Sequence, residues 1–197
     1  LRMDTDSVAP VGSHEALFER FRDENIPVMV GTQMVTKGLN FENVTLVGVL
    51  SADQSLDSGS YKASERTFSL ITQVVGRSGR GNKPGRAVIQ SFTPENETVL
   101  QAAKQDYDEF YNSEIELRKL HSLPPFTDIF TVTASGLEEE LVHGASCYVR
   151  SFFDVKLAGR SDCIVFGPTP PAVVKLNNRY RYLVNINCKN SREIRAL

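Results

Sequence analysis

The chain has 197 residues, 41% of them hydrophobic, so it can bury a sizeable core and is not a disordered polypeptide. Its formal net charge of −2 excludes a strongly basic protein, and any contact with nucleic acid must come from local patches. No apolar run reaches the roughly 18 residues that predict a membrane span.

The first 95 residues alternate predicted strands and helices. Ser13 suits the N-cap of a helix over 14–25 that carries Leu17, Phe18 and Phe21 on one side. We expect strands at 1–3, 28–32, 44–50 and 87–92 and a further helix at 64–80. The continuous apolar run 44–50 indicates a parallel strand covered on both faces. This order predicts an α/β domain with a parallel sheet, and its opening in mid-strand suggests a piece of a longer chain.

Charged helices follow at 96–122, with Pro94 in a first-turn position, and LPPF at 123–126 ends them. Residues 123–197 then predict a small α+β domain. Its elements are a strand at 129–134, a helix at about 137–157 and strands at 172–176 and 180–189. Asn177 and Asn178 suit a two-residue hairpin turn because Asn tolerates positive φ.

The three cysteines, Cys147, Cys163 and Cys188, are widely spaced and form no C-x-x-C pair. We expect three reduced thiols and neither a disulfide framework nor a metal site. His14, His121 and His143 are equally scattered, so they indicate no metal or catalytic constellation.

The segment ITQVVGRSGRGNKPGR, residues 71–86, carries the most unusual pattern. A helix turns by about 100° per residue, which places Arg66, Gln73, Arg77 and Arg80 in one sector. Phe68, Ile71 and Val75 fall on the opposite side and predict the core face. Each glycine within a helix costs roughly 1 kcal/mol against alanine, so Gly76 and Gly79 suggest close approach of a ligand or another backbone.

An ordinary helix end explains part of the same pattern. Arginines near a helix C-terminus complement the helix dipole, and Gly81 suits the position after a C-cap. That explanation covers Arg77 and Arg80 but not Gln73, Gly76 or Gly79. A second stretch, VGTQMVTKGLNF at 30–41, follows a predicted strand with small polar residues. Such a loop offers backbone N–H groups and a hydroxyl to a phosphate.

Together the two stretches resemble motifs V and VI of superfamily 2 helicases. The strings GTQMVTKGLNFENVTLVGVLSAD, TQVVGRSGRGNKPGRAVIQSF, ELRKLHSLPPF and VFGPTPPAVVKLNNRYRYLV, with RMDTDS at the start, are similar to those of the primosomal replication-restart helicases. The resemblance covers nearly the whole chain. It implies a RecA-like parallel-sheet helicase lobe over 1–95, connecting helices over 96–122 and a C-terminal α+β domain over 123–197 that lacks a final strand.

The resemblance also implies roles for individual residues. Arg77 and Arg80 are the expected arginine fingers of ATP hydrolysis, with Gln73 in the same nucleotide-facing rank as a third catalytic residue. Expected nucleotide contacts come from Gly38, Asn40, Gly76 and Gly79. Expected DNA contacts come from Gly31, Thr32, Gln33 and Lys37.

The last part of the chain is rich in basic residues, with Glu193 as the one acidic residue among them. On a strand, Tyr180 and Tyr182 would point away from Arg179 and Arg181. We expect a tyrosine-lined core under a basic face, with DNA contacts from Lys175, Arg179 and Arg181. The resemblance implies branched fork DNA, single-stranded DNA, single-stranded DNA-binding protein and other primosome proteins as partners. Arg192 is the candidate contact for the acidic tail of the single-stranded DNA-binding protein.

The implied activity is ATP-dependent 3′–5′ DNA translocation in the cytoplasm, at stalled replication forks. ATP and Mg²⁺ are expected mainly on another lobe, because no G-x-x-x-x-G-K-[ST] loop occurs in this chain. The chain alone is expected to hydrolyse no ATP. The zinc-binding cysteine cluster of the family is also absent from these residues. Two alternatives remain open: another superfamily 2 lobe, such as that of an RNA helicase, and a non-catalytic module that binds phosphate or nucleic acid.

Overall fold

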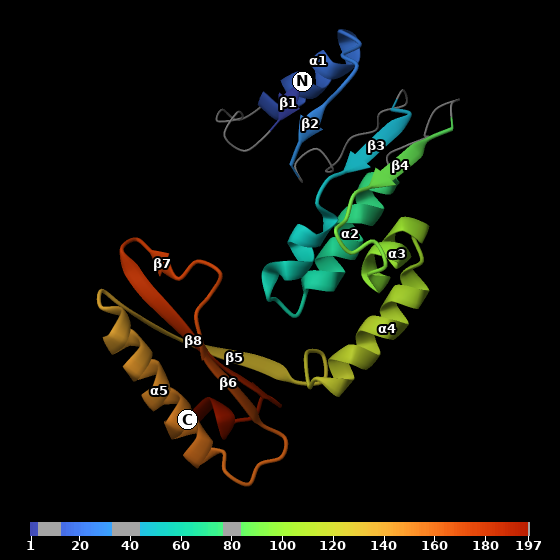
Figure 1. Cartoon of the computed structure of the whole chain (residues 1–197). Coiled ribbons are helices and arrows are strands. Elements are labelled where there is room, and N and C mark those ends of the chain that lie inside the picture. The colour runs from blue at the N-terminus through green and yellow to red at the C-terminus, as the bar shows by residue number, and fades with distance from the viewer. Residues whose placement is uncertain (4–12, 33–43, 77–83, 197) are drawn as a thin grey trace. The chain divides into compact units, whose positions relative to one another are not determined.

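The computed structural model describes residues 1–3, 13–32, 44–76 and 84–196 (Figure 1). The chain divides into two compact units, an N-terminal unit, Leu1–Phe110, and a C-terminal unit, Tyr111–Leu197. The division falls within helix α4 (Tyr107–Leu120). The expected boundaries at 95 and 123 stay a prediction.

In its described residues the N-terminal unit contains two pairs of parallel strands, as expected for an α/β fold. Strand β1 (Arg2–Met3) pairs with β2 (Val30–Gly31), and helix α1 (Ser13–Asp23) lies between them in the chain. Strand β3 (Leu46–Val49) pairs in parallel with β4 (Arg86–Ile89). Between β3 and β4 the chain forms the short helix η2 (Ala52–Ser58) and α2 (Ala63–Val75).

The core of this unit forms where α2 meets η2 and α3 (Glu97–Lys104). The rings of Phe68 and Phe110 stack with centroids 4.2 Å apart. Val49 and Ile89 pack against the same cluster from the strands. The buried members are Ala52, Phe68, Ile71, Val99, Ala102 and Phe110.

Three details of the sequence-based expectation for this unit were wrong. Leu46 and Leu50 are exposed, so the strand predicted over 44–50 is not covered on both faces. Its alternate side chain, Val49, faces the α2 core, because successive side chains of a strand point to opposite faces. The strand predicted over 28–32 was expected to be buried, but Val28 and Val30 are exposed. Helix α3 starts at Glu97, not at Pro94, because the Asn96 side chain accepts the N–H bonds of Thr98 and Val99 as N-cap.

The C-terminal unit is an α+β domain, as predicted. Its central strand β8 (Arg179–Cys188) runs antiparallel to β5 (Asp128–Gly136) on one side and to β6 (Ile164–Thr169) and β7 (Lys175–Leu176) on the other. The expected hairpin between β7 and β8 is confirmed, with φ of 50° at Asn177 and 61° at Asn178. The long helix α5 (Glu139–Lys156) packs on this sheet (Figure 1).

The two faces of the sheet differ sharply. Val184, Ile186 and Cys188 of β8 are buried, and Ile186 and Cys188 share a hydrophobic cluster with Phe153 of α5. Tyr182 also points toward α5, where its hydroxyl donates to Glu139 at 3.0 Å and its ring contacts His143. The alternate residues of β8 therefore face away from α5, which confirms the expected separation of tyrosines and arginines.

Strand β6 was not anticipated, because the Gly-Pro step at 167–168 is typical of a loop. In the structure this step forms an irregularity in the β6–β8 register between Phe166 and Thr169. Gly167 has a φ of 98°, and an added Cβ would lie 2.5 Å from the carbonyl oxygen of Leu183. Glycine is therefore required where the irregular strand approaches β8.

Candidate nucleotide and nucleic-acid sites

Helix α2 presents a polar face that includes one of the three expected catalytic residues. Arg66, Ser69 and Gln73 are exposed at helical spacing. The Gln73 amide donates to the Ser69 hydroxyl at 3.4 Å. Phe68 and Ile71 are buried on the other side, which confirms the predicted apolar stripe.

The end of α2 differs from the expectation. The helix ends at Val75, and Gly76 is its C-cap, with φ of −66° and its N–H bonded to the Thr72 carbonyl at 3.0 Å. Gly76 is therefore not an internal helix glycine, and the entropic cost assigned to it does not apply. An added Cβ would lie 3.2 Å from the Thr72 carbonyl oxygen, a tight contact, and 3.8 Å from Gln105 Nε2. Arg77, Gly79 and Arg80 lie outside the described residues.

The loop expected to contact DNA is described only at its start. Gly31 ends strand β2, and Thr32 follows it, both exposed. This position at the carboxyl end of a parallel strand is where ligands bind in α/β sheets. Gln33, Lys37, Gly38 and Asn40 lie outside the described residues, and their roles stay predictions.

The carboxyl ends of β3 and β4 are joined by Asp53, a residue that sequence reasoning missed. Its carboxylate accepts bonds from the Ser91 hydroxyl at 2.5 Å, the Phe92 N–H at 2.8 Å and the Thr93 hydroxyl at 2.7 Å. These bonds, that from Ser91 foremost, hold the pKa of Asp53 far below its usual range. A carboxylate so fully bonded fixes η2, and hence the start of α2, rather than acting as a base. One sequence signal could have indicated this contact: an Asp follows β3, and a Ser-x-Thr sequence follows its neighbour β4.

The three cations expected to contact DNA do not share one face of the C-terminal sheet. Lys175 pairs with Tyr180, and its Nζ lies 4.6 Å from that ring, on the side of the tyrosines. Arg179 points the other way, where its guanidinium donates to the hydroxyl and the carbonyl of Ser135 at 3.2 Å each. Arg181 lies on the same face as Arg179 and donates to the Val173 carbonyl at 2.6 Å.

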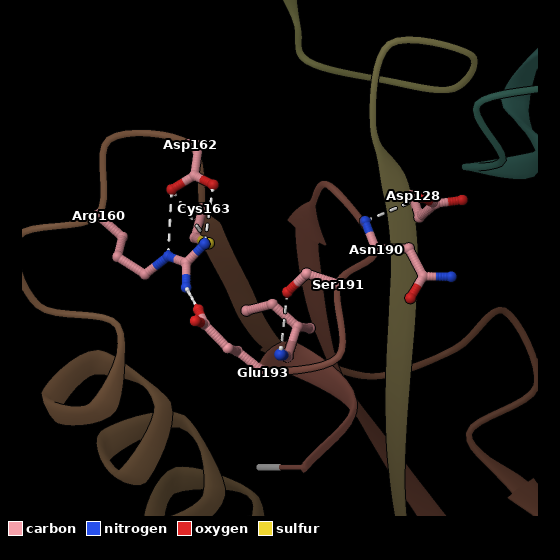
Figure 2. Close-up of polar contacts among 8 residues, drawn as sticks. Asp128, Arg160, Asp162, Cys163, Asn190, Ser191 and Glu193 are labelled. Atoms are coloured by element: carbon pink, nitrogen blue, oxygen red, sulfur yellow. Dashed lines mark hydrogen bonds and ion pairs between the residues drawn. The ribbon is translucent and has the colours of Figure 1, made fainter.

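Arg192, the candidate partner contact, is exposed in the turn before the short helix η3 (Ile194–Ala196). Figure 2 shows how this turn is fixed: Arg160 bonds Glu193 at 3.3 Å and Asp162 at 3.0 Å, and the Asn190 N–H donates to Asp128 at 3.1 Å. The guanidinium of Arg160 lowers the pKa of Asp162. Because Glu193 is engaged by Arg160, it does not neutralise Arg192.

An apolar cavity of about 260 Å³ lies between α5, the sheet and η3, and sequence reasoning did not indicate it. Arg195, rather than Arg192, lies at this cavity. Its lining residues are Phe130, Val132, Phe153, Leu157, Ile186, Ile194 and Arg195.

Within the described residues, no group of three or more His, Cys, Asp or Glu side chains could hold a metal ion. All three cysteines are free thiols, and burial raises the pKa of Cys188 to about 11. No helix in the described parts of the chain is long and apolar enough to cross a bilayer.

Comparison with known families defines the class of the chain. Residues 6–82 match the helicase conserved C-terminal domain, and residues 119–197 match the C-terminal domain of primosomal protein N. The chain thus joins a helicase lobe of α/β type to a domain known from primosomal proteins.

Individual relatives make the assignment more specific. The chain is 38% identical over 197 residues to replication restart protein PriA of Bacillus subtilis, covering 100% of this chain and 24% of the relative. It is 36% identical to the protein of that name from Chlamydia pneumoniae and 46% identical to that from Chlamydia muridarum, each over 184 residues. Each of these alignments covers 93% of this chain, and 25% and 24% of the two relatives, respectively. The chain belongs to the PriA family and spans about a quarter of the length of these relatives.

Proposed function

We propose that the chain supplies the second motor lobe and the C-terminal domain of an ATP-dependent 3′–5′ DNA helicase that restarts stalled replication forks. The observation that carries the proposal is the exposed polar face of α2. Gln73 lies on this face with Arg66, and the helix ends directly before the segment that carries Arg77 and Arg80. Family membership gives this arrangement its motor context.

In this proposal Arg77 and Arg80 act across a cleft on ATP that is held mainly by another lobe. A guanidinium offers fixed, bidentate donors to the oxygens of a transferring phosphoryl group. An arginine finger is worth roughly 10³–10⁵ in rate, or about 4–7 kcal/mol. Gln73 faces the nucleotide from the same side of α2 as a third catalytic residue. The remaining nucleotide contacts come from Gly38, Asn40, Gly76 and Gly79. Mg²⁺ would be held mainly by the other lobe and would supply neutralisation of phosphate charge there.

The proposed DNA path uses backbone contacts from Gly31, Thr32, Gln33 and Lys37. Because the arginine fingers and this loop belong to one lobe, closure on ATP also moves the loop along the strand. The C-terminal unit adds fork DNA contacts through Lys175, Arg179 and Arg181. Single-stranded DNA-binding protein, contacted by Arg192, and other primosome proteins are the proposed partners, in the cytoplasm.

The test joins this chain to a lobe that carries a Walker loop and measures DNA-stimulated ATP hydrolysis. Arg80→Ala should lower the rate by roughly 10³-fold or more, with Arg77→Ala as the parallel variant. Arg20→Ala, which removes an exposed arginine of α1, is the control and should retain most activity. Full activity of both finger variants contradicts the proposal, as does ATP turnover by the pure chain alone.

A further inference from the structure

Helix α5 covers one face of the C-terminal sheet and leaves a second apolar stripe exposed (Figure 1). Val142 and Leu157 are buried on the side that faces the sheet. Several other apolar residues of the helix lie at helical spacing outside this buried side. We call this surface the α5 stripe and define it by the following residues: Leu141, Gly144, Tyr148, Phe152 and Val155.

The side chains of the α5 stripe recur with the period of a helix–helix interface. Leu141, Tyr148 and Val155 are seven residues apart, and they are 67%, 74% and 76% exposed. Gly144 and Phe152 lie between them on the same side of the helix. Single apolar side chains on a surface are ordinary. A seven-residue period along about 21 Å of one helix is instead the pattern of two helices that pack along their length.

The α5 stripe is complementary to itself when a second α5 runs antiparallel to it. A two-fold axis at Tyr148 sets Leu141 against Val155, because each lies seven residues from the axis. Gly144 and Phe152 each lie four residues from it, so the ring of one copy meets the glycine of the other. A Cβ added at Gly144 would have nothing within 4 Å in the single chain, so this position is open to an incoming side chain.

Two charges beside the α5 stripe follow the same symmetry. Glu140 and Lys156 are exposed and each lie eight residues from Tyr148, so the axis sets the glutamate of one copy against the lysine of the other. Among the residues that the structure describes, neither forms an ion pair within the chain. The Lys156 Nζ lies only over the Phe152 ring, at 5.8 Å from its centroid.

Neighbouring charged residues of α5 are engaged within the chain. Glu139 accepts a hydrogen bond from the Tyr182 hydroxyl at 3.0 Å, and Arg150 bonds Asp154 at 2.8 Å. Glu140, near the start of the helix, and Lys156, at its end, are therefore available to a second copy. A parallel pair of helices would set like charges together at both positions, so these charges select the antiparallel arrangement.

We propose that the α5 stripe is the interface of a two-fold symmetric dimer of this chain, with the two α5 helices antiparallel about Tyr148. The same surface on both copies is the arrangement that a closed two-fold dimer requires. An anionic membrane is a poorer occupant, because interfacial helices are rich in basic residues and the first turn of α5 is acidic. A partner helix of unrelated sequence would not require the stripe to match itself about one residue.

This inference goes beyond the proposed motor function. It uses none of the residues assigned to ATP or DNA, and it requires neither ATP nor another lobe. Failure of the ATPase test therefore leaves it standing, and its own failure leaves the motor standing.

Sedimentation equilibrium of the 197-residue chain tests the dimer. The concentration range is about 10 μM to about 500 μM, because one pair of helices buries less area than a standard interface and should hold weakly. The mass should rise from 21.9 kDa toward twice that value. Tyr148→Glu places two like charges on the axis and should keep the chain monomeric, whereas Tyr148→Phe should dimerise. Val173→Glu adds the same charge at an exposed apolar residue outside α5 and should also dimerise.

Charge reversal tests the antiparallel register. Glu140→Lys and Lys156→Glu should each weaken the dimer between about 2-fold and about 30-fold, because each affects two ion pairs. The double reversal should restore the wild-type dissociation constant, and so should mixing the two single variants. Lys189→Glu makes the same change outside α5 and should have no effect.

Circular dichroism confirms that each variant is folded. A monomer at every concentration overturns the proposal and leaves the α5 stripe to another partner. A dimer that survives Tyr148→Glu, or a double reversal that dimerises more weakly than both single variants, overturns it as well.

Discussion

The two units close their cores differently. In the C-terminal unit a four-stranded antiparallel sheet buries Val184, Ile186 and Cys188 beneath α5. In the N-terminal unit the parallel strands come in separate pairs, and Leu46, Leu50 and Val88 remain exposed. Side-chain alternation on β8 gives the C-terminal unit its layers. The N-terminal unit relies instead on helix packing around α2 and on polar anchors such as Asp53. The number of strands in a unit therefore does not predict how much stability that unit loses on substitution.

The largest expected effects come from core truncation, one in each unit. Ile71 and Ile186 are both almost fully buried. Ile71→Ala and Ile186→Ala should each lower the free energy of unfolding by about 2–5 kcal/mol through lost burial and cavity formation. Denaturant unfolding followed by hydrogen exchange should assign each loss to its own unit. If either variant lowered hydrogen-exchange protection equally in both units, the two units would not have independent cores.

A smaller effect tests the irregular strand of the C-terminal unit. Gly167→Ala should cost about 1–3 kcal/mol, because the new Cβ meets the Leu183 carbonyl and φ is positive. Gly144→Ala is the matched control in α5, where an added Cβ meets nothing within 4 Å. The control should stabilise the helix by roughly 0.5–1 kcal/mol. Thermal unfolding of both variants distinguishes strain from a general intolerance of alanine.

In the N-terminal unit the cap of α3 should matter less than its core. Asn96 accepts bonds from two N–H groups at the helix start, at 3.0 and 3.4 Å. Asn96→Ala should cost about 1 kcal/mol, and Asn96→Asp should retain most of the stability. Urea titration provides the measurement. A loss as large as that of Ile71→Ala would mean that the cap, not the core, holds this unit.

The last effect is a pH dependence carried by Asp53, which is smallest near neutral pH and appears in acid. Its pKa is lowered on folding, so its stabilising contribution is complete above the unfolded value of about 3.9 and is lost as pH falls toward the folded value. Stability of the N-terminal unit should be flat near neutral pH and decline in acid. Asp53→Asn should remove this part of the acid dependence. Unfolding curves between about pH 3 and pH 7 provide the comparison, and an unchanged acid dependence would contradict it.

Sequence patterns predicted elements where a local rule was decisive. Alternation on 180–189, the Asn177–Asn178 turn and the apolar stripe of α2 were all confirmed. Patterns failed where the outcome depended on distant partners. The apolar run 44–50 does not indicate that only one of its faces is covered. The Gly-Pro step predicted a loop where the structure has strand β6. Asp53 was missed because its partners are almost forty residues away, at the end of another strand. Among the candidate site residues, Arg77 and Arg80 lie outside the described residues. The structure does describe the following candidates: Gly31, Thr32, Gln73, Gly76, Lys175, Arg179, Arg181 and Arg192.

The alternation of β8 also limits how this protein can change. Its even-numbered residues face the helix and its odd-numbered residues form the opposite face of the sheet, over the same short length of chain. A single inserted or deleted codon within this strand would exchange the two sets on one side of the change, because each side chain there would turn to the opposite face. Such a frame-preserving indel would remove the hydrophobic layer and the outer surface at once. Substitutions at alternate positions, in contrast, can alter one property while sparing the other.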